Sequence, residues 1–324
     1  MKITRNMIDK ELRFRGKLLD QLVTKSTEEK FIRSMHNSKK QMDKRFKGKD
    51  VEGLDCNEVL ISRKDDSLIR VRIYKPLHPV KEVPGVLWIH GGGYAQGVPE
   101  MSGDMYKRLL DAKDCVIVAP DYRLSIDAPY PAALEDCYEV LLWMKEHAKE
   151  LGIRDDQLMA GGESAGGGLT VALALYARDK GEVNLAFQMP LYPMMDDRME
   201  TESARDNNAP VWNSATNRWG WKLYLGELYG QDVPAYAAAA RAEDYGNLPP
   251  AVTFVGDIEP FRDETIQYVE NLRSAGVPVD FEIYKGAYHG FDIIHSKAQV
   301  SQTARNFLMD AFQYAADHYF APQT

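Results

Sequence analysis

The chain has few cysteines. Only three occur in 324 residues, at Cys56, Cys115 and Cys137. They form no Cys-x-x-Cys pair and their number is odd, which argues against a disulfide framework and against a zinc site. We therefore expect free thiols buried in the core, and no metal ion.

Long apolar runs are lacking too. The start of the chain, Met1 to Gly16, carries charges throughout and has no apolar segment of the kind that a signal peptide requires. No later stretch is long and apolar enough to span a bilayer. These features predict a cytoplasmic protein without stable insertion into a membrane.

Positive charge is in the minority, since 40 Lys and Arg face 48 Asp and Glu and the net charge is −8. This balance disfavours nucleic acid as a partner. The first 50 residues are an exception, with 15 basic and 7 acidic side chains. Mixed charges and apolar residues at helix-like spacings, such as Phe31 and Met35, predict a solvated helical segment there.

What the chain does contain is an alternation of strand and helix patterns. Short apolar runs at 85–90 and 115–120 are typical of buried parallel strands, and an antiparallel pair at 59–62 and 68–74 precedes them. Further strands are expected at 157–160, 185–191, 251–255 and 279–284, and helices at 105–112, 133–150, 165–177, 263–275 and 298–318. The order predicts an α/β fold, with a mainly parallel sheet and helices on both faces.

The alternation stops between residues 193 and 248. This stretch is rich in Trp, Tyr, Asn, Ala and charge, and it is too long for an ordinary connection. We interpret it as an inserted, partly helical cap.

One motif gives the chain a candidate nucleophile. Gly162-Glu163-Ser164-Ala165-Gly166 matches G-x-S-x-G, in which a serine occupies a sharp turn between a strand and a helix. A strand pattern precedes the motif and a helix pattern follows it, as that turn requires. The alternative is a glycine-rich connection with an incidental serine.

Serine needs a base and oxyanion donors to act as a nucleophile. His289 follows the last predicted strand and is the best base, because imidazole can accept and return a proton near neutrality. His90-Gly91-Gly92-Gly93-Tyr94 follows the strand at 85–89 and matches the HGGG element of lipases and esterases. Its glycines let backbone N–H groups approach a substrate oxygen, and the Ala165 N–H would complete the oxyanion hole. His90 is expected to fix this loop.

The acid that orients the base should come from the loop after the strand at 251–255, which gives the chain order Ser, acid, His. That loop offers four carboxylates, and spacing alone does not choose among them: Asp257, Glu259, Asp263 and Glu264.

With these motifs the chain resembles the hormone-sensitive-lipase-like branch of the α/β-hydrolases, bacterial carboxylesterases and acetyl esterases with an HGGG motif. The resemblance covers about residues 55–320 and rests also on three further runs: Asp121 to Leu124, Pro131 to Asp136, and Tyr288 to Phe291. The family usually has Asp-Pro-Leu-x-Asp-Glu at the acid loop, so its alignment with Glu259-Pro260-Phe261-Arg262-Asp263-Glu264 implies that Glu259 is the acid. Asp257 stays the second candidate, because the family residue is an Asp.

The resemblance further implies an α/β-hydrolase catalytic domain over residues 51–324, with residues 1–50 and the insertion at about 193–248 forming a helical cap. Aromatic residues are candidates for lining a pocket under it: Tyr94, Tyr192, Trp212, Trp219 and Trp221. The implied activity is that of a serine carboxylesterase acting on acetyl to hexanoyl esters through an acyl-enzyme, with no cofactor.

Two other functions fit the same motifs. An amidase, deacetylase or peptidase would use the same residues, because a Ser-His-acid set does not select between ester and amide. A ligand-binding protein on this fold is the third reading, and His289 weighs against it. The sequence leaves open whether the protein forms a homodimer.

Overall fold

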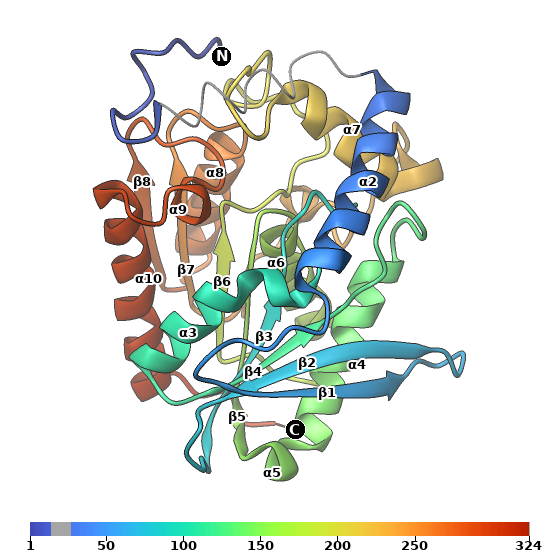
Figure 1. The fold of residues 1–324 in the computed structure, drawn as a ribbon, viewed down its shortest axis with the longest axis vertical. Helices are drawn as coiled ribbons and strands as arrows, with labels where there is room; N and C mark the ends of the chain where they lie inside the picture. Colours follow the sequence, from blue (N-terminus) through green and yellow to red (C-terminus); the bar gives the residue numbers. More distant parts are fainter. Residues whose placement is uncertain (14–26, 324) are drawn as a thin grey trace.

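The computed structural model describes residues 1–13 and 27–323 of the chain. Eight strands form one central sheet (Figure 1) in the order β1-β2-β4-β3-β5-β6-β7-β8. Strands β3 to β8 pair in parallel, whereas β2 is antiparallel to both of its neighbours, β1 and β4. The strands are β1 (Asp55–Ser62), β2 (Leu68–Lys75), β3 (Val83–Ile89), β4 (Val116–Pro120), β5 (Ile153–Glu163), β6 (Phe187–Leu191), β7 (Ala251–Gly256) and β8 (Val279–Tyr284).

The predicted mainly parallel sheet and its antiparallel opening are confirmed. Most strand ends lie close to the predicted ones, but β5 begins at Ile153, before the expected residue 157. Its first residues include Arg154, Asp155 and Asp156, which are half-buried or exposed. A strand end that projects into solvent has no apolar pattern, and a sequence pattern therefore misses it.

Helices cover both faces of the sheet. The longer ones beside it are α3 (Gly103–Ala112), α4 (Ala132–Glu146), α6 (Ala165–Lys180), α8 (Arg262–Ser274) and α10 (Gln299–His318), with short turns at η1 (Pro99–Ser102), α5 (Ala148–Leu151) and α9 (Phe291–Ile294). Alternate residues of β3 point to opposite cores, as the period of two in a strand requires. Leu87 packs in the core with α4, α6 and α8, and Trp88 packs in the core with α3 and α10.

The helix expected over 133–150 is divided in the structure. Helix α4 ends at Glu146, and α5 begins at Ala148. Between them the backbone of His147 leaves helical geometry, at φ −105° and ψ 17°, and its ring Nδ1 binds the carbonyl oxygen of Trp143 at 3.0 Å. The hydrogen bond of the His147 ring to Trp143 thus occurs at the residue where the helix is interrupted.

The first 50 residues are only partly helical. Helix α2 (Glu28–Phe46) is present, and Phe31 and Met35 are its buried residues. Residues 1–12 form turns instead of the predicted helix, because their backbone bonds to another part of the chain: the Asp9 N–H donates to the Gly286 carbonyl at 2.9 Å. The rest of the predicted segment, at 14–26 with Leu18, Leu19 and Leu22, lies outside the described residues.

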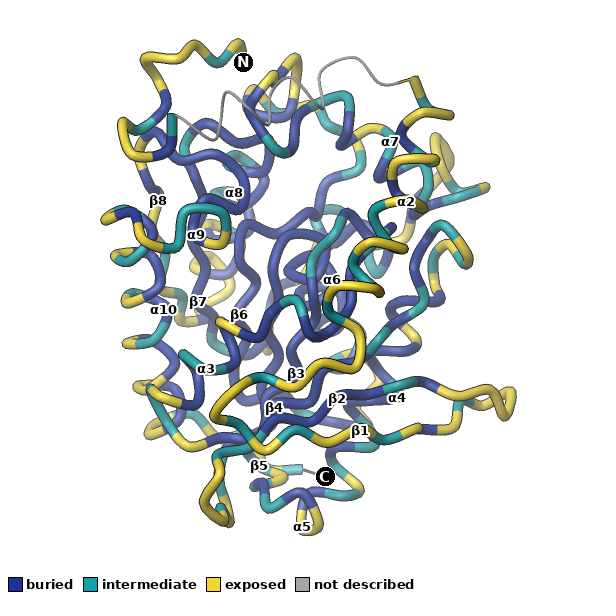
Figure 2. Tube along the Cα trace, viewed as in Figure 1, coloured by how far each residue is buried: buried dark blue, intermediate teal, exposed yellow. Residues whose placement is uncertain are grey.

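The stretch at 193–248 contains α7 (Ser214–Leu225), η2 (Gly226–Leu228) and η3 (Ala239–Arg241). Helices α2 and α7 lie side by side at one end of the molecule (Figure 1), and the Lys222 ammonium binds the Glu28 carboxylate at 2.8 Å between them. Figure 2 shows the central strands of the sheet buried, and the edge strand β1 and the outer side of α2 largely exposed. Two segments far apart in sequence therefore meet above the sheet.

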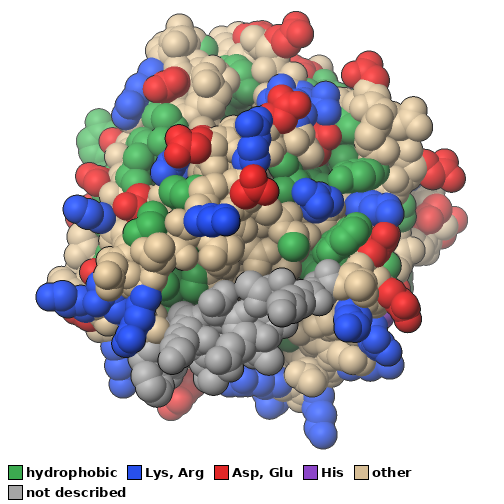
Figure 3. Space-filling model, turned by 90° about the horizontal axis from the view of Figure 1, so that it is seen from above, with side chains coloured by type: hydrophobic (Ala, Val, Ile, Leu, Met, Phe, Trp, Pro, Cys, Tyr) green, Lys and Arg blue, Asp and Glu red, His purple; other side chains and the backbone are tan. Residues whose placement is uncertain are grey.

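Charges of both signs are interspersed over much of the face seen in Figure 3, where the described side chains are coloured by type. Of the three free cysteines, Cys115 and Cys137 are buried as expected, while Cys56 is half-buried. Among the helices of residues 1–13 and 27–323, none is long and apolar enough to cross a membrane.

Candidate active site

Ser164 occupies a sharp turn between β5 and α6. Its backbone has φ 58° and ψ −117°, a region that is strained for any residue with a side chain. The turn can form because glycines flank it: a Cβ atom on Gly166 would lie 2.0 Å from the Ile89 carbonyl oxygen, and one on Gly162 would lie 2.4 Å from the same atom. The turn presents the Ser164 hydroxyl at the carboxyl end of the parallel strands, where loops meet.

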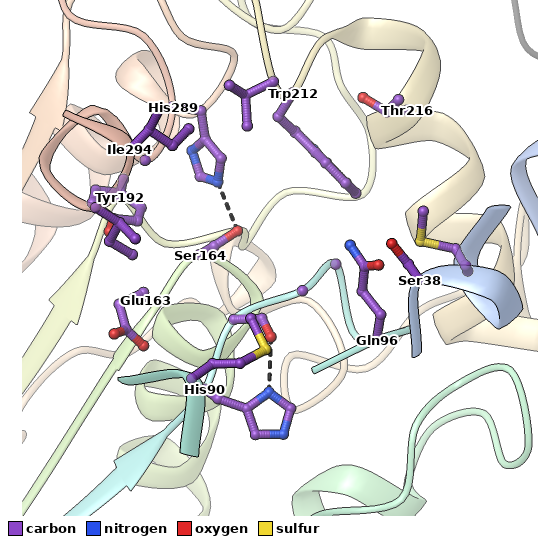
Figure 4. A pocket seen from close by; sticks show the side chains of 18 of the residues that line it. Ser38, His90, Gln96, Glu163, Ser164, Tyr192, Trp212, Thr216, His289 and Ile294 are labelled. Carbon is purple, nitrogen blue, oxygen red and sulfur yellow. Dashed lines mark hydrogen bonds between the residues drawn. The ribbon is translucent and has the colours of Figure 1, made fainter. Parts of the chain in front are cut away.

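A hydrogen-bonded chain links Ser164 to two other predicted residues. Ser164 Oγ lies 2.8 Å from His289 Nε2, and His289 Nδ1 binds Glu259 Oε2 on its other side (Figure 4 labels Ser164 and His289). The second carboxylate oxygen of Glu259 accepts the Gly256 N–H at 2.9 Å. The residues follow β5, β7 and β8, and Glu259 is fully buried. Such a chain can take the proton from a serine hydroxyl.

Asp257, the second candidate acid, lies elsewhere. Its Oδ1 accepts the Gly286 N–H at 2.6 Å and therefore ties its loop to the turn after β8. Burial raises the pKa of this carboxyl above its usual range. The structure thus joins Glu259, and not Asp257, to His289.

The HGGG loop passes beside Ser164. A Cβ on Gly91 would lie 3.4 Å from Ser164 Cβ, and Gly92 has φ 125°, where a Cβ would meet the Gln96 carbonyl oxygen at 2.0 Å. His90 is buried, stacks on Tyr122 with ring centroids 4.3 Å apart, and bonds through Nδ1 to the Gly91 oxygen at 2.8 Å. Burial lowers its pKa. A buried neutral ring held in this way fixes the loop.

A cavity of about 750 Å³ opens onto Ser164 and His289. One wall comes from α2 and the opposite wall from the segment that follows His289 (Figure 4). The lining residues include Phe31, Met35, Ser38, Gln96, Met101, Ser102, Glu163, Tyr192, Trp212, Thr216, Ile293 and Ile294. The site is therefore a mostly apolar pocket with a few polar groups around a serine hydroxyl.

Comparison with known proteins places this geometry in a family. A family model described as alpha/beta hydrolase fold matches residues 86–293. The chain belongs to the α/β-hydrolase fold family. Within it, the chain belongs to the hormone-sensitive-lipase-like branch with the HGGG motif.

Several relatives are named esterases. The chain is 35% identical over 230 residues to esterase LipI of Mycobacterium tuberculosis, covering 69% of this chain and 71% of that protein. It is 30% identical to an arylesterase of Saccharolobus solfataricus, covering 70% and 74%. Among solved structures, a bacterial heroin esterase superposes with a TM-score of 0.88 at 32% identity, covering 97% of this chain and 99% of that one.

Two of the five aromatic residues proposed above for the pocket do line it. Tyr192 and Trp212 belong to the wall, whereas Tyr94, Trp219 and Trp221 do not. Tyr94 is buried beneath it: its hydroxyl donates to the Met194 carbonyl at 2.8 Å, and its ring stacks on Tyr224 at 3.8 Å. Tyr94 is thus a core residue, for which the prediction was wrong.

The tryptophans of α7 also point away from the pocket. Trp221 is fully buried and packs on Tyr94, with ring centroids 5.7 Å apart. Trp219 is half-buried against the same core, and the Lys222 ammonium lies 5.9 Å from its ring. The helix turns its aromatic side chains toward the core and presents Thr216 to the cavity.

Sequence reasoning missed most of the wall formed by α2 and by the residues after His289. Phe31 and Met35 were recognised as an apolar pair, but nothing in their spacing said what they cover. Ser38, Gln96 and Ile294 carried no signal, because single polar or apolar residues outside a motif have no pattern.

Glu163, which directly precedes Ser164, is a buried acid that also lines the cavity. Its Oε2 accepts the Trp88 indole N–H at 3.0 Å and the Ser102 hydroxyl at 3.4 Å. Burial raises the pKa of Glu163 to about 7, and the nearby Asp292 adds to the increase. The carboxyl therefore changes its charge near neutral pH, next to the serine.

Proposed function

We propose that the protein is a serine carboxylesterase that hydrolyses short-chain acyl esters through an acyl-enzyme. The observation that carries this proposal is the 2.8 Å contact of Ser164 Oγ with His289 Nε2, with Glu259 bound to the other ring nitrogen. The esterase names of several relatives support it.

In the proposed reaction Ser164 Oγ attacks the ester carbonyl carbon while His289 Nε2 takes its proton. Glu259 holds the ring in the tautomer with a proton on Nδ1 and stabilises the imidazolium that forms. The carbonyl oxygen becomes an oxyanion, for which the N–H groups of Gly92, Gly93 and Ala165 are the proposed donors. Ala165 opens α6, and the first N–H groups of a helix have no partner within it.

The tetrahedral intermediate then breaks its bond to the alcohol oxygen, which leaves with the proton of His289. The acyl group remains on Ser164 as an ester. Water attacks this ester with the same proton transfers, and the free acid leaves. Each proton transferred in these acylation and deacylation steps passes through His289.

The proposed preference for short acyl chains rests on the roof of the pocket. Trp212 lies against the HGGG loop, since a Cβ on Gly93 would be 2.4 Å from its ring. Phe31 of α2 packs edge-on against the same indole, with ring centroids 6.4 Å apart. The indole N–H of Trp212 donates to the Asn217 side-chain oxygen at 3.2 Å. A fixed indole this close to the proposed oxyanion donors leaves little length for an acyl chain. We propose that α2 and residues 193–248 form the cap that holds it.

The test is hydrolysis of p-nitrophenyl esters of graded chain length, beside the corresponding p-nitroanilide. We expect kcat/KM to be highest between acetyl and hexanoyl and the anilide to be much slower. If the anilide were hydrolysed faster than the ester, the protein would be an amidase and not an esterase. Cytoplasmic location stays a prediction from the sequence, which leaves the oligomeric state open.

A further inference from the structure

The backbone of Ser164 is held by the segment that follows β6. The Ser164 N–H donates to the Leu191 carbonyl, and the Met194 N–H donates to the Ser164 carbonyl, both at 3.0 Å. The segment packs tightly against α6: a Cβ on Gly168, one turn into that helix, would lie 2.0 Å from the Met194 carbonyl oxygen. A shift of this segment therefore moves Ser164.

The same segment is held from its other side by Glu264. This residue lies in the first turn of α8, five positions after Glu259. Its Oε1 accepts the N–H of Met195 at 2.7 Å and that of Asp196 at 3.3 Å. One side chain thus connects the loop that carries Glu259 with the segment bonded to Ser164.

Glu264 occupies this place at a cost to stability. It is only 2% exposed, and its Oε2 has no hydrogen-bond partner among the described residues. Burial raises the pKa of this carboxyl well above its usual range, and Asp196 adds to the increase. A buried acid that is only partly hydrogen-bonded is unfavourable, and such residues are expected where function, rather than packing, requires them.

We propose that Glu264 is a positioning residue for the hydrolysis, which fixes the 194–196 segment and thereby keeps Ser164 in register with His289 and Glu259. The inference rests on the proposed function, and it adds a residue that touches neither substrate nor the reacting atoms. Displacement of a reacting group by about 1 Å can lower a rate about 10²-fold.

The test compares three variants of the full chain. Glu264→Gln keeps an oxygen that accepts both N–H groups and should retain kcat within a few-fold. Glu264→Met keeps the length and removes the acceptor. We expect it to lower kcat on a short p-nitrophenyl ester about 10- to 100-fold with KM nearly unchanged, and to slow labelling by a fluorophosphonate in parallel.

Thr265→Val is the matched control for stability. Thr265 is the next residue of α8, is buried, and donates its hydroxyl to the Phe261 carbonyl at 2.7 Å. This variant should lower Tm and leave kcat unchanged. If Glu264→Met retains full kcat, or if Thr265→Val loses as much kcat at an equal loss of Tm, Glu264 is only structural.

Should Glu264→Met fail to fold, Glu264→Asp decides the question, because its carboxyl is one methylene too short to reach both N–H groups. Undiminished kcat in a folded Glu264→Asp would overturn the inference. A wild-type protein without ester hydrolysis would instead overturn the proposed function, so the two failures are distinguishable.

Discussion

Replacing Glu259 by Gln removes one negative charge with almost no change in shape. In the wild type, one carboxylate oxygen accepts from His289 and the other from the Gly256 N–H at 2.9 Å. An amide has one acceptor end and one donor end, so it cannot serve both N–H groups. If its oxygen stays on Gly256, its NH₂ faces His289 Nδ1 and places the ring proton on Nε2, where it blocks proton transfer from Ser164.

The size of the effect follows from these contacts. In the productive tautomer the His289 Nδ1–H would face the N–H of the introduced amide in a buried site. Two donors that face each other cost about 1–3 kcal/mol, which corresponds to a loss in kcat of about 5- to 150-fold. Loss of the charged hydrogen bond to the imidazolium adds about 1.5–3 kcal/mol. Together they predict a fall in kcat of about 10²- to 10⁴-fold, and the aspartate-to-asparagine change in the serine-protease template reaches about 10⁴.

The assay is kcat on a short p-nitrophenyl ester, with circular dichroism and Tm to show that the fold is retained. Asp257→Asn is the matched control, because its amide oxygen can still accept the Gly286 N–H, and it should change kcat far less. Glu259→Asp should retain partial activity, since the shorter side chain keeps the charge and loses reach. Near-wild-type turnover in Glu259→Gln with collapse in Asp257→Asn would reverse the assignment of the acid.

Three further outcomes are expected. His289→Ala should lose nearly as much kcat as Ser164→Ala, since residues that act as a unit fail together, and residual turnover far above that of Ser164→Ala would separate them. Soluble short esters should be hydrolysed faster than long-chain triglyceride emulsions, and a jump in rate at the lipid interface would show that Trp212 does not limit the pocket. Because the pKa of Glu163 is raised to about 7 from 4.5, the folded state binds its proton more tightly, and wild-type stability should fall as pH rises from about 4.5 to about 7. Glu163→Gln should therefore gain stability over the wild type across that range, by up to about 3 kcal/mol, and a difference in unfolding free energy that does not change with pH would contradict this.

The sequence predicts those parts of the site that local chain geometry defines. The turn at Ser164 needs Gly162 and Gly166 because their Cβ atoms would collide with the Ile89 carbonyl, so the motif records a steric requirement. The sequence predicts the central strands equally well, because a strand that is buried on both faces is an unbroken apolar run. The fold class followed from these two kinds of signal.

Other features depend on contacts between distant segments. Tyr94 adjoins the HGGG loop in sequence, yet its ring stacks on Tyr224, and only the fold shows that it belongs to the core. In residues 1–12 the Asp9 N–H bonds to the loop after β8 and the Ile3 N–H bonds to the Asn208 side chain, so an apolar spacing there does not mean a helix. The role of α2 as a pocket wall was likewise invisible, because Phe31 and Met35 read only as a buried pair.

The most direct test of Ser164 as the nucleophile is active-site labelling with a fluorophosphonate, read by intact mass and peptide mapping. We expect one adduct per chain, at Ser164, formed at a rate that parallels kcat and absent in a folded Ser164→Ala variant. An adduct on any other serine, or undiminished ester hydrolysis in Ser164→Ala, would contradict it.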